Sequence, residues 1–230
     1  MAGTFRGRRG SGCPAFPTCC GRQLRSIAAT RTRLDRQLSL HEATGEAAFV
    51  DRALAWVDVL DARFWDESGG YFLAEAGMSA RQTLIDETAA PSGNGMMLGV
   101  LPRLAALCGN DHYRRRAEDI VRRFADRMSR ASIAAATALN NASALDRLVQ
   151  IVVIANPALA REAAAHLVPD RLLIPVADPE AASPGYPAHG KTATAAYVCI
   201  GPMCLAPVSD PAALSHLLAN KPSYPARKSA

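Results

Sequence analysis

The sequence predicts a mainly α-helical chain that ends in a small α/β unit, and two patterns predict it. Between residues 45 and 148, apolar side chains recur every three or four positions, the period of helices with one buried face. From Val149 the pattern changes to a β-branched run that ends before Asn156, followed by a helix-like stretch and a second apolar run. A strand, a helix and a strand in succession favour a parallel βαβ unit.

The composition indicates a globular protein. Of the 230 residues, 49% are apolar and 20% are charged, which is too apolar for a chain that is disordered throughout. No run approaches the roughly 18 to 20 apolar residues that a membrane-spanning helix needs. We therefore expect no membrane partner.

Basic charge gathers at the start of the chain. The pI is about 9.1, but the first forty residues hold eight arginines against Asp35 alone, which leaves the remainder nearly neutral. Gly and Pro interrupt this segment, so we expect no specific nucleic-acid binding. Its Arg- and Ser-rich, acid-poor composition is also that of transit peptides. Residues 1–44 are predicted to be a basic, disordered extension.

The helical part is predicted to begin near Gly45. Apolar residues at helical spacing continue to Phe64, so we expect a first amphipathic helix there. Gly69 and Gly70 can end a helix and permit a turn, and a short extended loop should follow.

A second helix is expected to begin within residues 91–94. Ser92 or Asn94 can accept hydrogen bonds from the free backbone N–H groups of its first turn. Its apolar residues run from 97 to 108, and Gly109 closes it. Pro102 lies inside this helix and should kink it, because proline removes one backbone hydrogen bond.

A third helix has the clearest apolar stripe in the chain, over residues 113–128. The link before it is short, so the second and third helices should form an αα-hairpin. Residues 132–148 are rich in Ala and predict a fourth helix, which Asn140 and Asn141 weaken. Residues 45–148 are thus interpreted as helical hairpins.

The α/β unit is expected to span residues 149–218. Its predicted strands are 149–154 and 171–176, with a third at 195–199 after a loop rich in Pro and Gly. A sheet of so few strands is not stable alone. We therefore expect the α/β unit to pack on the helices. Residues 219–230 are predicted to be a disordered tail.

Four sequence segments in this order resemble the thioredoxin-domain-containing family of the spermatogenesis-associated protein 20 type, over roughly residues 45–218. The segments are FWDESGGYF (64–72), PSGN (91–94), IVVI (151–154) and AYVC (196–199), the last with Cys204 and Pro207. The resemblance implies the C-terminal third of a protein with a thioredoxin-like domain and an (α/α)6 toroid.

That toroid is similar to the N-acylglucosamine 2-epimerases and the six-hairpin glycosidases, so the resemblance implies carbohydrate binding or modification. The thioredoxin-like domain and the earlier hairpins have no counterpart in this sequence, which implies a partial toroid that is inactive alone. A toroid without these hairpins exposes apolar flanks, for which a helical partner chain is expected. The expected location is cytoplasmic, and no cofactor is expected.

The toroid resemblance directs attention to the loop before the second helix, which would face the central pocket. Asp86 and Glu87 are its candidate catalytic carboxylates, and Ser92 and Asn94 are candidate substrate-binding groups. Adjacent residues of an extended segment project to opposite faces, so one carboxylate at most would meet a substrate. The alternative is that the carboxylates are solvated and that the polar groups cap the helix.

Trp65 and Tyr71 are candidates for stacking on a saccharide ring, because aromatic faces suit the apolar faces of sugars. They could equally complete the core of a hairpin. The five histidines stand outside every motif, so epimerisation by histidine is not supported, and no metal site is expected.

Four residues separate Cys199 from Cys204, whereas two separate the cysteines of a thioredoxin site. A turn at Gly201 and Pro202 would bring them together as a reversible disulfide or as half of a metal site, but the sequence offers no second Cys or His pair nearby to complete a zinc site. The alternative is two reduced thiols with a structural role in a cytosolic protein.

Three functional hypotheses remain open from the sequence. The first is a saccharide-binding or saccharide-modifying remnant of a toroid, with the enzyme activity left undecided. The second is a non-catalytic structural or interaction fragment. The third is a thiol redox module that uses Cys199 and Cys204.

Overall fold

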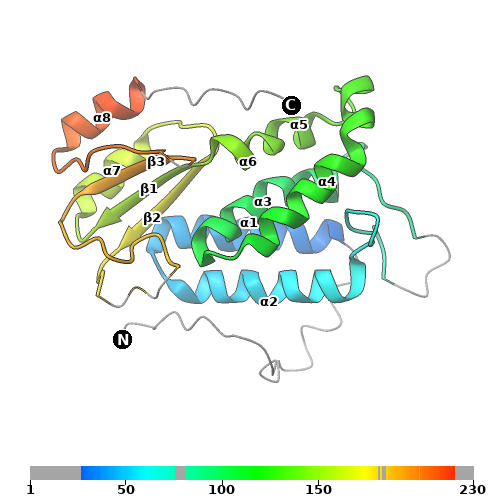
Figure 1. The fold of residues 1–230 in the computed structure, drawn as a ribbon, viewed down its shortest axis with the longest axis horizontal. Helices are drawn as coiled ribbons and strands as arrows, with labels where there is room; N and C mark the ends of the chain where they lie inside the picture. Colours follow the sequence, from blue (N-terminus) through cyan, green and yellow to red (C-terminus); the bar gives the residue numbers. More distant parts are fainter. Residues whose placement is uncertain (1–26, 76–80, 181, 183–184, 202, 221–230) are drawn as a thin grey trace.

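The structure is a computed structural model that describes residues 27–75, 81–180, 182, 185–201 and 203–220. Within these residues the long helices α1 to α4 lie together on one face of a four-stranded sheet, and two short helices, α7 and α8, cover the other face (Figure 1). The prediction of a mainly helical chain with a small C-terminal α/β unit is confirmed.

The first helical hairpin pairs α1 (Ile27–Thr44) with α2 (Ala47–Phe64). Gly45 makes the turn between them with a φ of 74°, and its N–H donates to the carbonyl of His41. The buried face of α2 repeats every three or four residues, as the sequence predicted. It consists of Val50, Ala53, Val57, Leu60 and Phe64.

Helix α1 corrects one prediction. Residues 1–44 were expected to be disordered, but residues 27–44 form a helix whose Ile27, Leu34 and Leu38 are fully buried. These three side chains recur at helical spacing, and the arginines between them obscure that period when charge is averaged over the whole segment. The rest of the predicted extension, residues 1–26, lies outside the described residues.

The second hairpin pairs α3 (Gly93–Cys108) with α4 (Asp111–Arg130). The Ser92 hydroxyl accepts the N–H of Gly95 at the start of α3, and Gly109 ends the helix in the left-handed conformation. Helix α3 continues through Pro102. The predicted stripe of α4 is buried on the core side. It includes Tyr113, Ala117, Ile120, Phe124 and Met128.

The Ala-rich stretch 132–148 does not form one helix. It is divided between α5 (Ala136–Ala142) and α6 (Ala144–Arg147), which meet at Ser143. The Ser143 hydroxyl donates to the carbonyl of Asn140, as side chains that compete with helical hydrogen bonds do. The break gives α5 its own direction beside α3, which it contacts.

The predicted βαβ unit is present. Strand β1 (Val149–Ile154) runs into α7 (Pro157–Ala165), and β2 (Arg171–Val176) returns parallel to β1. On the other side of β1, the antiparallel strands β3 (Ala196–Ile200) and β4 (Met203–Cys204) complete the order β2-β1-β3-β4.

The two faces of the sheet bury different side chains. Val152, Ile154, Leu172 and Ile174 pack on the helical layer, and the alternating residues, such as Ile151, pack under α7 and α8 (Pro211–Ala219). The α/β unit therefore shares the core of the helices. Helix α8 ends at the start of the predicted tail, of which residues 221–230 lie outside the described part. None of the described helices combines the length and apolarity needed to cross a membrane.

Candidate functional site

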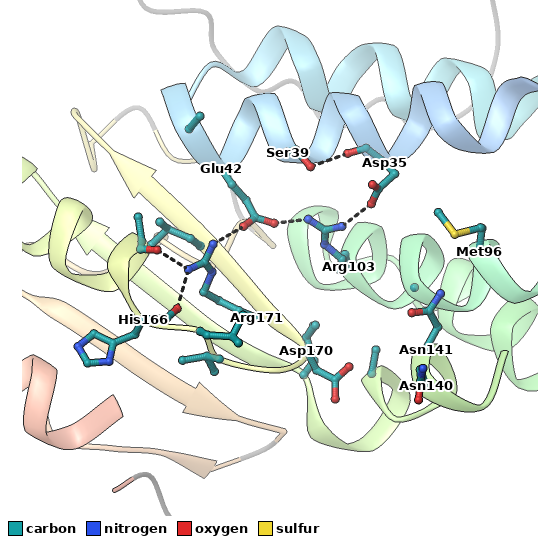
Figure 2. A pocket seen from close by; sticks show the side chains of 18 of the residues that line it. Asp35, Ser39, Glu42, Met96, Arg103, Asn140, Asn141, His166, Asp170 and Arg171 are labelled. Atoms are coloured by element: carbon teal, nitrogen blue, oxygen red, sulfur yellow. Dashed lines mark hydrogen bonds and ion pairs between the residues drawn. The ribbon is translucent and has the colours of Figure 1, made fainter. Parts of the chain in front are cut away.

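A cavity of about 840 Å³ opens where the helical layer meets the α/β unit. Its walls come from α1, α3, α5 and the segment that joins α7 to β2, so distant parts of the sequence meet there (Figure 2). Polar and apolar residues line it in about equal number. The polar residues include Asp35, Ser39, Arg103, Asn140, Asn141 and Asp170.

Arg103 is the central cation of this cavity. Its guanidinium pairs with Asp35 at 3.1 Å and with Glu42, both from α1, while Arg103 itself comes from α3 (Figure 2). The Nε–H of Arg103 is buried and has no hydrogen-bond partner among the described residues. One buried donor is thus left unused beside the cavity, where most buried polar groups are paired.

Arg171 is a second cation in the wall, at the start of β2. Its guanidinium lies 3.8 Å from Glu42 and donates to the carbonyl oxygens of Ala163 and His166 at the end of α7. A cation at this position suits the negative end of the helix dipole. Arg171 therefore joins α7 to α1 and holds one wall of the cavity in place.

Polar groups of α5 and the turn before β2 form the opposite wall. The Asn141 amide donates to the carbonyl of Gly95 at 2.9 Å, which fixes α5 on α3. Asp170 adopts a φ of 55° and accepts the Ser143 hydroxyl at 2.7 Å. The side chain of Asn140 is solvent-exposed and makes no hydrogen bond within the described residues, so it remains available to a ligand.

His166 lines the cavity but turns its ring toward α8. Its Nε2 lies 2.8 Å from the Ser215 hydroxyl and 3.1 Å from the Glu162 carboxylate. Both contacts involve the same ring nitrogen, so this is not the relay of a catalytic triad, in which each nitrogen has its own partner. We interpret His166 as a link between α7 and α8.

The predicted carboxylates of the loop before α3 point away from each other, as the sequence predicted. Asp86 pairs with Arg127 of α4 at 2.9 and 3.0 Å, and hydrogen bonds from that guanidinium lower the pKa of Asp86. Glu87 accepts the Thr137 N–H, which lowers the pKa of Glu87. Neither carboxylate lines the cavity, and their catalytic role stays a prediction.

The polar candidates of the second helix have partners inside the chain. Ser92 caps α3, and Asn94 is 0% exposed. The Asn94 side chain accepts the N–H of Tyr71 at 2.7 Å and donates to the carbonyl oxygens of Tyr71 and Leu84. Binding of a substrate by these two residues stays a prediction.

The aromatic candidates lie in the core between α2 and α4. Tyr71 is 0% exposed, its hydroxyl donates to Asp61 at 2.6 Å, and burial raises its pKa. Trp65 meets Tyr71 edge to face, with ring centroids 5.0 Å apart, and carries the Arg116 guanidinium 3.7 Å from its ring centroid. Neither ring lines the cavity, and saccharide stacking on them stays a prediction.

Cys199 and Cys204 are joined by a disulfide, so the structure brings the two redox candidates together. The alternative of two reduced thiols is not the state that the structure shows. Within the described part of the chain, no group of three or more His, Cys, Asp or Glu side chains is arranged to hold a metal ion.

The sequence reasoning missed the residues that line the cavity. Asp35 was placed in the basic extension, and Asn140 was considered only as a weakness in a helix. One signal was present, because Arg103 interrupts an otherwise apolar helix (GNGMMLGVLPRLAALC) without an acidic residue one turn away. An isolated charge in such a helix needs a partner from another element.

Comparison with known proteins finds relatives but no matching family model. The chain is 29% identical to human spermatogenesis-associated protein 20 over 201 residues, which cover 79% of this chain and 25% of the human protein. The mouse protein is 28% identical over the same shares. The rat protein is 30% identical over 149 residues, or 60% of this chain and 19% of the rat protein. The chain spans about a quarter of the length of these relatives.

Proposed function

Because this chain is related to spermatogenesis-associated protein 20, we propose that it is part of a six-hairpin, glycosidase-like toroid and that its cavity binds a small uncharged saccharide. The observation that carries the proposal is that polar side chains from three separate helices, Asp35, Arg103 and Asn140, line one cavity. The proposed role is ligand binding only, and no reaction is proposed.

The arrangement of the helices supports the toroid. Helices α1 and α2 form one antiparallel hairpin, α3 and α4 form the next, and α3 contacts both α1 and α4. In an (α/α)6 toroid, successive hairpins stand side by side in this way, with one helix of each in an inner ring. The cavity opens beside α1 and α3, which would place both in that ring.

The size of the cavity supports a ligand of one or two sugar rings. Pockets for small molecules usually measure roughly 300 to 1,000 Å³, and this one measures about 840 Å³. Its carboxylates accept hydrogen bonds, its guanidinium groups donate them, and Asn140 and Asn141 can do both. Adjacent hydroxyl groups of a sugar also donate and accept, so the two surfaces are complementary.

The charges of the cavity favour an uncharged sugar over a sugar phosphate. Arg103 and Arg171 are already engaged by Asp35 and Glu42, and Asp170 adds a further carboxylate to the wall. A phosphate group would find the charge of both guanidinium groups already paired with carboxylates, and it would lie near three carboxylates. Asp35 and Glu42 both pair with Arg103. We therefore propose that these carboxylates position the Arg103 guanidinium and accept hydrogen bonds from the hydroxyl groups of the sugar.

Thermal unfolding of the whole chain with and without a sugar tests the proposal. A ligand at 100 times its Kd adds about 2.7 kcal/mol to the free energy of unfolding, which raises the Tm of a chain this size by roughly 5 to 10 °C. We expect such a rise with N-acetylglucosamine or glucose and none with glucose 6-phosphate.

Asn140→Ala is the matched variant for this experiment, because its side chain lines the cavity without supporting the fold. It should reduce the sugar-induced rise, whereas Gln82→Ala, an exposed amide outside the cavity, should leave it intact. The proposal is wrong if no uncharged sugar raises the Tm, or if both variants respond like the natural chain.

A second candidate is docking of a helical partner, favoured by apolar side chains in the loop before α3, in the turn between α4 and α5, and on α5. Ile133 is 91% exposed, and Leu84 and Leu139 are also exposed. The segments that carry these residues are joined, because Glu87 hydrogen-bonds the backbone of Ala134 and Thr137. We propose further helical hairpins as the occupant, since the relatives are about four times as long as this chain.

Sedimentation tests this second candidate. Where no hairpins cover these apolar side chains, a second copy of the chain should take their place, so the whole chain should self-associate. The double variant Ile133→Lys, Leu139→Lys should sediment as a monomer with unchanged helix content. A natural chain that is monomeric at high concentration would argue against an exposed docking face.

A further inference from the structure

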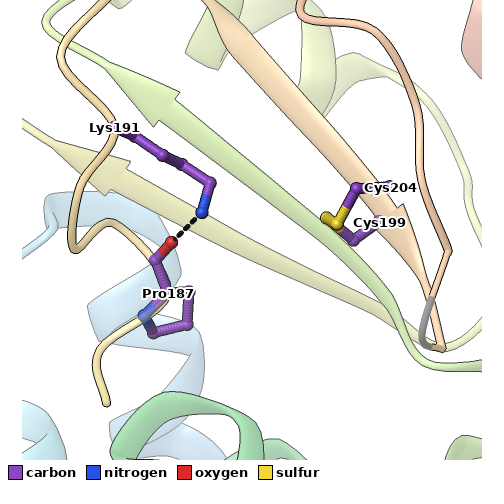
Figure 3. The surroundings of a disulfide bond; sticks show 4 residues. All are labelled: Pro187, Lys191, Cys199 and Cys204. Carbon is purple, nitrogen blue, oxygen red and sulfur yellow. Dashed lines mark hydrogen bonds between the residues drawn. A yellow bond between two sulfur atoms is a disulfide. The ribbon is translucent and has the colours of Figure 1, made fainter. Parts of the chain in front are cut away.

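The disulfide between Cys199 and Cys204 joins the outermost pair of strands. The two residues face each other directly across the antiparallel pair β3–β4 (Figure 3). Cys199 is 8% exposed, whereas Cys204 lies on the exposed edge strand. One sulfur atom of the bond therefore belongs to a buried residue and the other to an accessible residue.

The surroundings of this disulfide lack the features that activate a catalytic thiol. Such thiols lie at helix N-termini or beside a cation, which stabilises the thiolate. Both cysteines here lie on strands, and neither sulfur accepts a hydrogen bond from any described residue. Lys191 is engaged elsewhere, since its ammonium donates to the carbonyl of Pro187 (Figure 3). The same ammonium also approaches the ring of Tyr197.

We propose that Cys199 and Cys204 form a reversible disulfide that is a target of thiol–disulfide exchange and does not catalyse it. The co-reactant is a dithiol reductant, and the point of attack is the accessible Cys204 Sγ. Attack at Cys199 is disfavoured, because its neighbours in β3 and the body of the sheet cover it.

The exchange proceeds in two steps. A thiolate of the reductant attacks Cys204 Sγ, a mixed disulfide forms, and the bond to Cys199 breaks; the Cys199 thiolate leaves and takes a proton from water. The second thiol of the reductant then loses its proton and attacks the reductant's own sulfur. This step releases the Cys204 thiolate, which is protonated, and leaves the reductant as an internal disulfide. Two electrons have passed from the dithiol to the cysteine pair.

Reduction should loosen β4 without unfolding the sheet. The disulfide reinforces the very short strand β4. Directly after this strand, the Leu205 N–H donates to the carbonyl of Val198. Beyond it, Ala196 and Val208 exchange two backbone hydrogen bonds of 2.8 and 2.9 Å, and α8 follows. These contacts do not depend on the disulfide, so the change should be confined to β4 and Leu205.

Single-thiol variants of the whole chain test the point of attack. In a background with Ser at Cys13, Cys19, Cys20 and Cys108, Cys199→Ser leaves only Cys204, and Cys204→Ser leaves only Cys199. We expect 5,5′-dithiobis(2-nitrobenzoate) to react with Cys204 at least about tenfold faster than with Cys199. Circular dichroism confirms that both variants fold. Equal rates, or a faster Cys199, would overturn the assignment.

Dithiothreitol titration of the background variant with both cysteines tests reversibility and the structural consequence. We expect the pair to be reduced and re-oxidised with equal amplitude, and exchange of the Leu205 amide to quicken at least about tenfold on reduction. Amides of β1 should not change. Glutathione disulfide serves as the oxidant after dithiothreitol is removed. A pair that it cannot re-oxidise, or a Leu205 amide whose exchange rate does not depend on the redox state of the pair, would refute the proposal.

Discussion

The Asn94 side chain pairs with both backbone polar groups of Tyr71, accepting its N–H at 2.7 Å and donating to its carbonyl at 3.0 Å. This pairing is the equivalent of a β-bridge made by a side chain, and it joins α3 to the loop after α2. Asn94→Ala would leave these buried groups unpaired, which costs about 3 kcal/mol of the free energy of unfolding. Urea unfolding of the whole chain measures the loss.

The isosteric variant Asn94→Asp provides the control. It keeps the acceptor for Tyr71 N–H but loses the amide donor, so its destabilisation should be substantial although no volume is removed. A free energy of unfolding within about 0.5 kcal/mol of the natural value for Asn94→Ala would contradict the structural role of Asn94.

Gly45 should resist substitution more strongly than Gly190. Both have positive φ values, 74° and 75°, but a Cβ at Gly45 would lie 2.5 Å from the carbonyl oxygen of Pro175, whereas a Cβ at Gly190 meets nothing within 4 Å. Gly190→Ala should lower the free energy of unfolding by about 1 to 2 kcal/mol through backbone strain alone. Gly45→Ala should lower it clearly more, because α1 and β2 must also move apart. Equal losses in urea unfolding would show that the α1–β2 contact is not tight.

His41 should make the stability depend on pH. It is 1% exposed, and its Nδ1–H donates to the carbonyl of Glu46 at 3.1 Å. Burial lowers its pKa below the ordinary 6.5, against the opposing effect of Glu42. The unfolded chain therefore binds the proton first, and the free energy of unfolding should fall as the pH drops below about 6.5.

Urea unfolding between pH 7.5 and 5.5 checks this dependence on pH. His41→Gln should remove this part of the slope, while the exposed His216→Gln should keep it. If the free energy of unfolding of His41→Gln depends on pH as steeply as that of the natural chain, a group other than His41 is responsible.

Asp86→Asn should leave the response to sugar unchanged. Asp86 faces Arg127 of α4 and does not line the cavity, so no ligand in the cavity contacts it. The test is the sugar-induced rise in Tm of the variant, compared with that of Asn140→Ala. A lost response in Asp86→Asn would restore Asp86 as a candidate for substrate binding.

The fold could be predicted where one period dominates a segment. The apolar stripe of α4 and the β-branched run of β1 are patterns within a few consecutive residues, so the sequence reveals them directly. Both elements form as expected. Helix α1 was missed because its apolar face is narrow and lies among arginines. The break at Ser143 was missed because it depends on a side-chain hydrogen bond and on packing of α5 against α3.

The candidate site was less accessible to sequence reasoning. Asp35 and Arg103 are separated by 68 positions, and no local pattern shows that they pair. Motif reasoning favoured Trp65, Tyr71 and Asn94, which stand out in the sequence, yet the structure packs these side chains into the helical core. Residues that hold a hairpin together and residues that hold a ligand are of the same types, so only the three-dimensional arrangement separates them.

An NMR titration of the whole isotopically labelled chain with N-acetylglucosamine locates the ligand and thereby tests the saccharide site itself. We expect shifts in the side-chain amides of Asn140 and Asn141 and in the backbone amide of Gly99, all of which line the cavity. We expect no change in the indole N–H of Trp65 or the side-chain amide of Asn94. Shifts at Trp65 and Asn94 without shifts at Asn140, or no shifts at all, would contradict a saccharide site in this cavity.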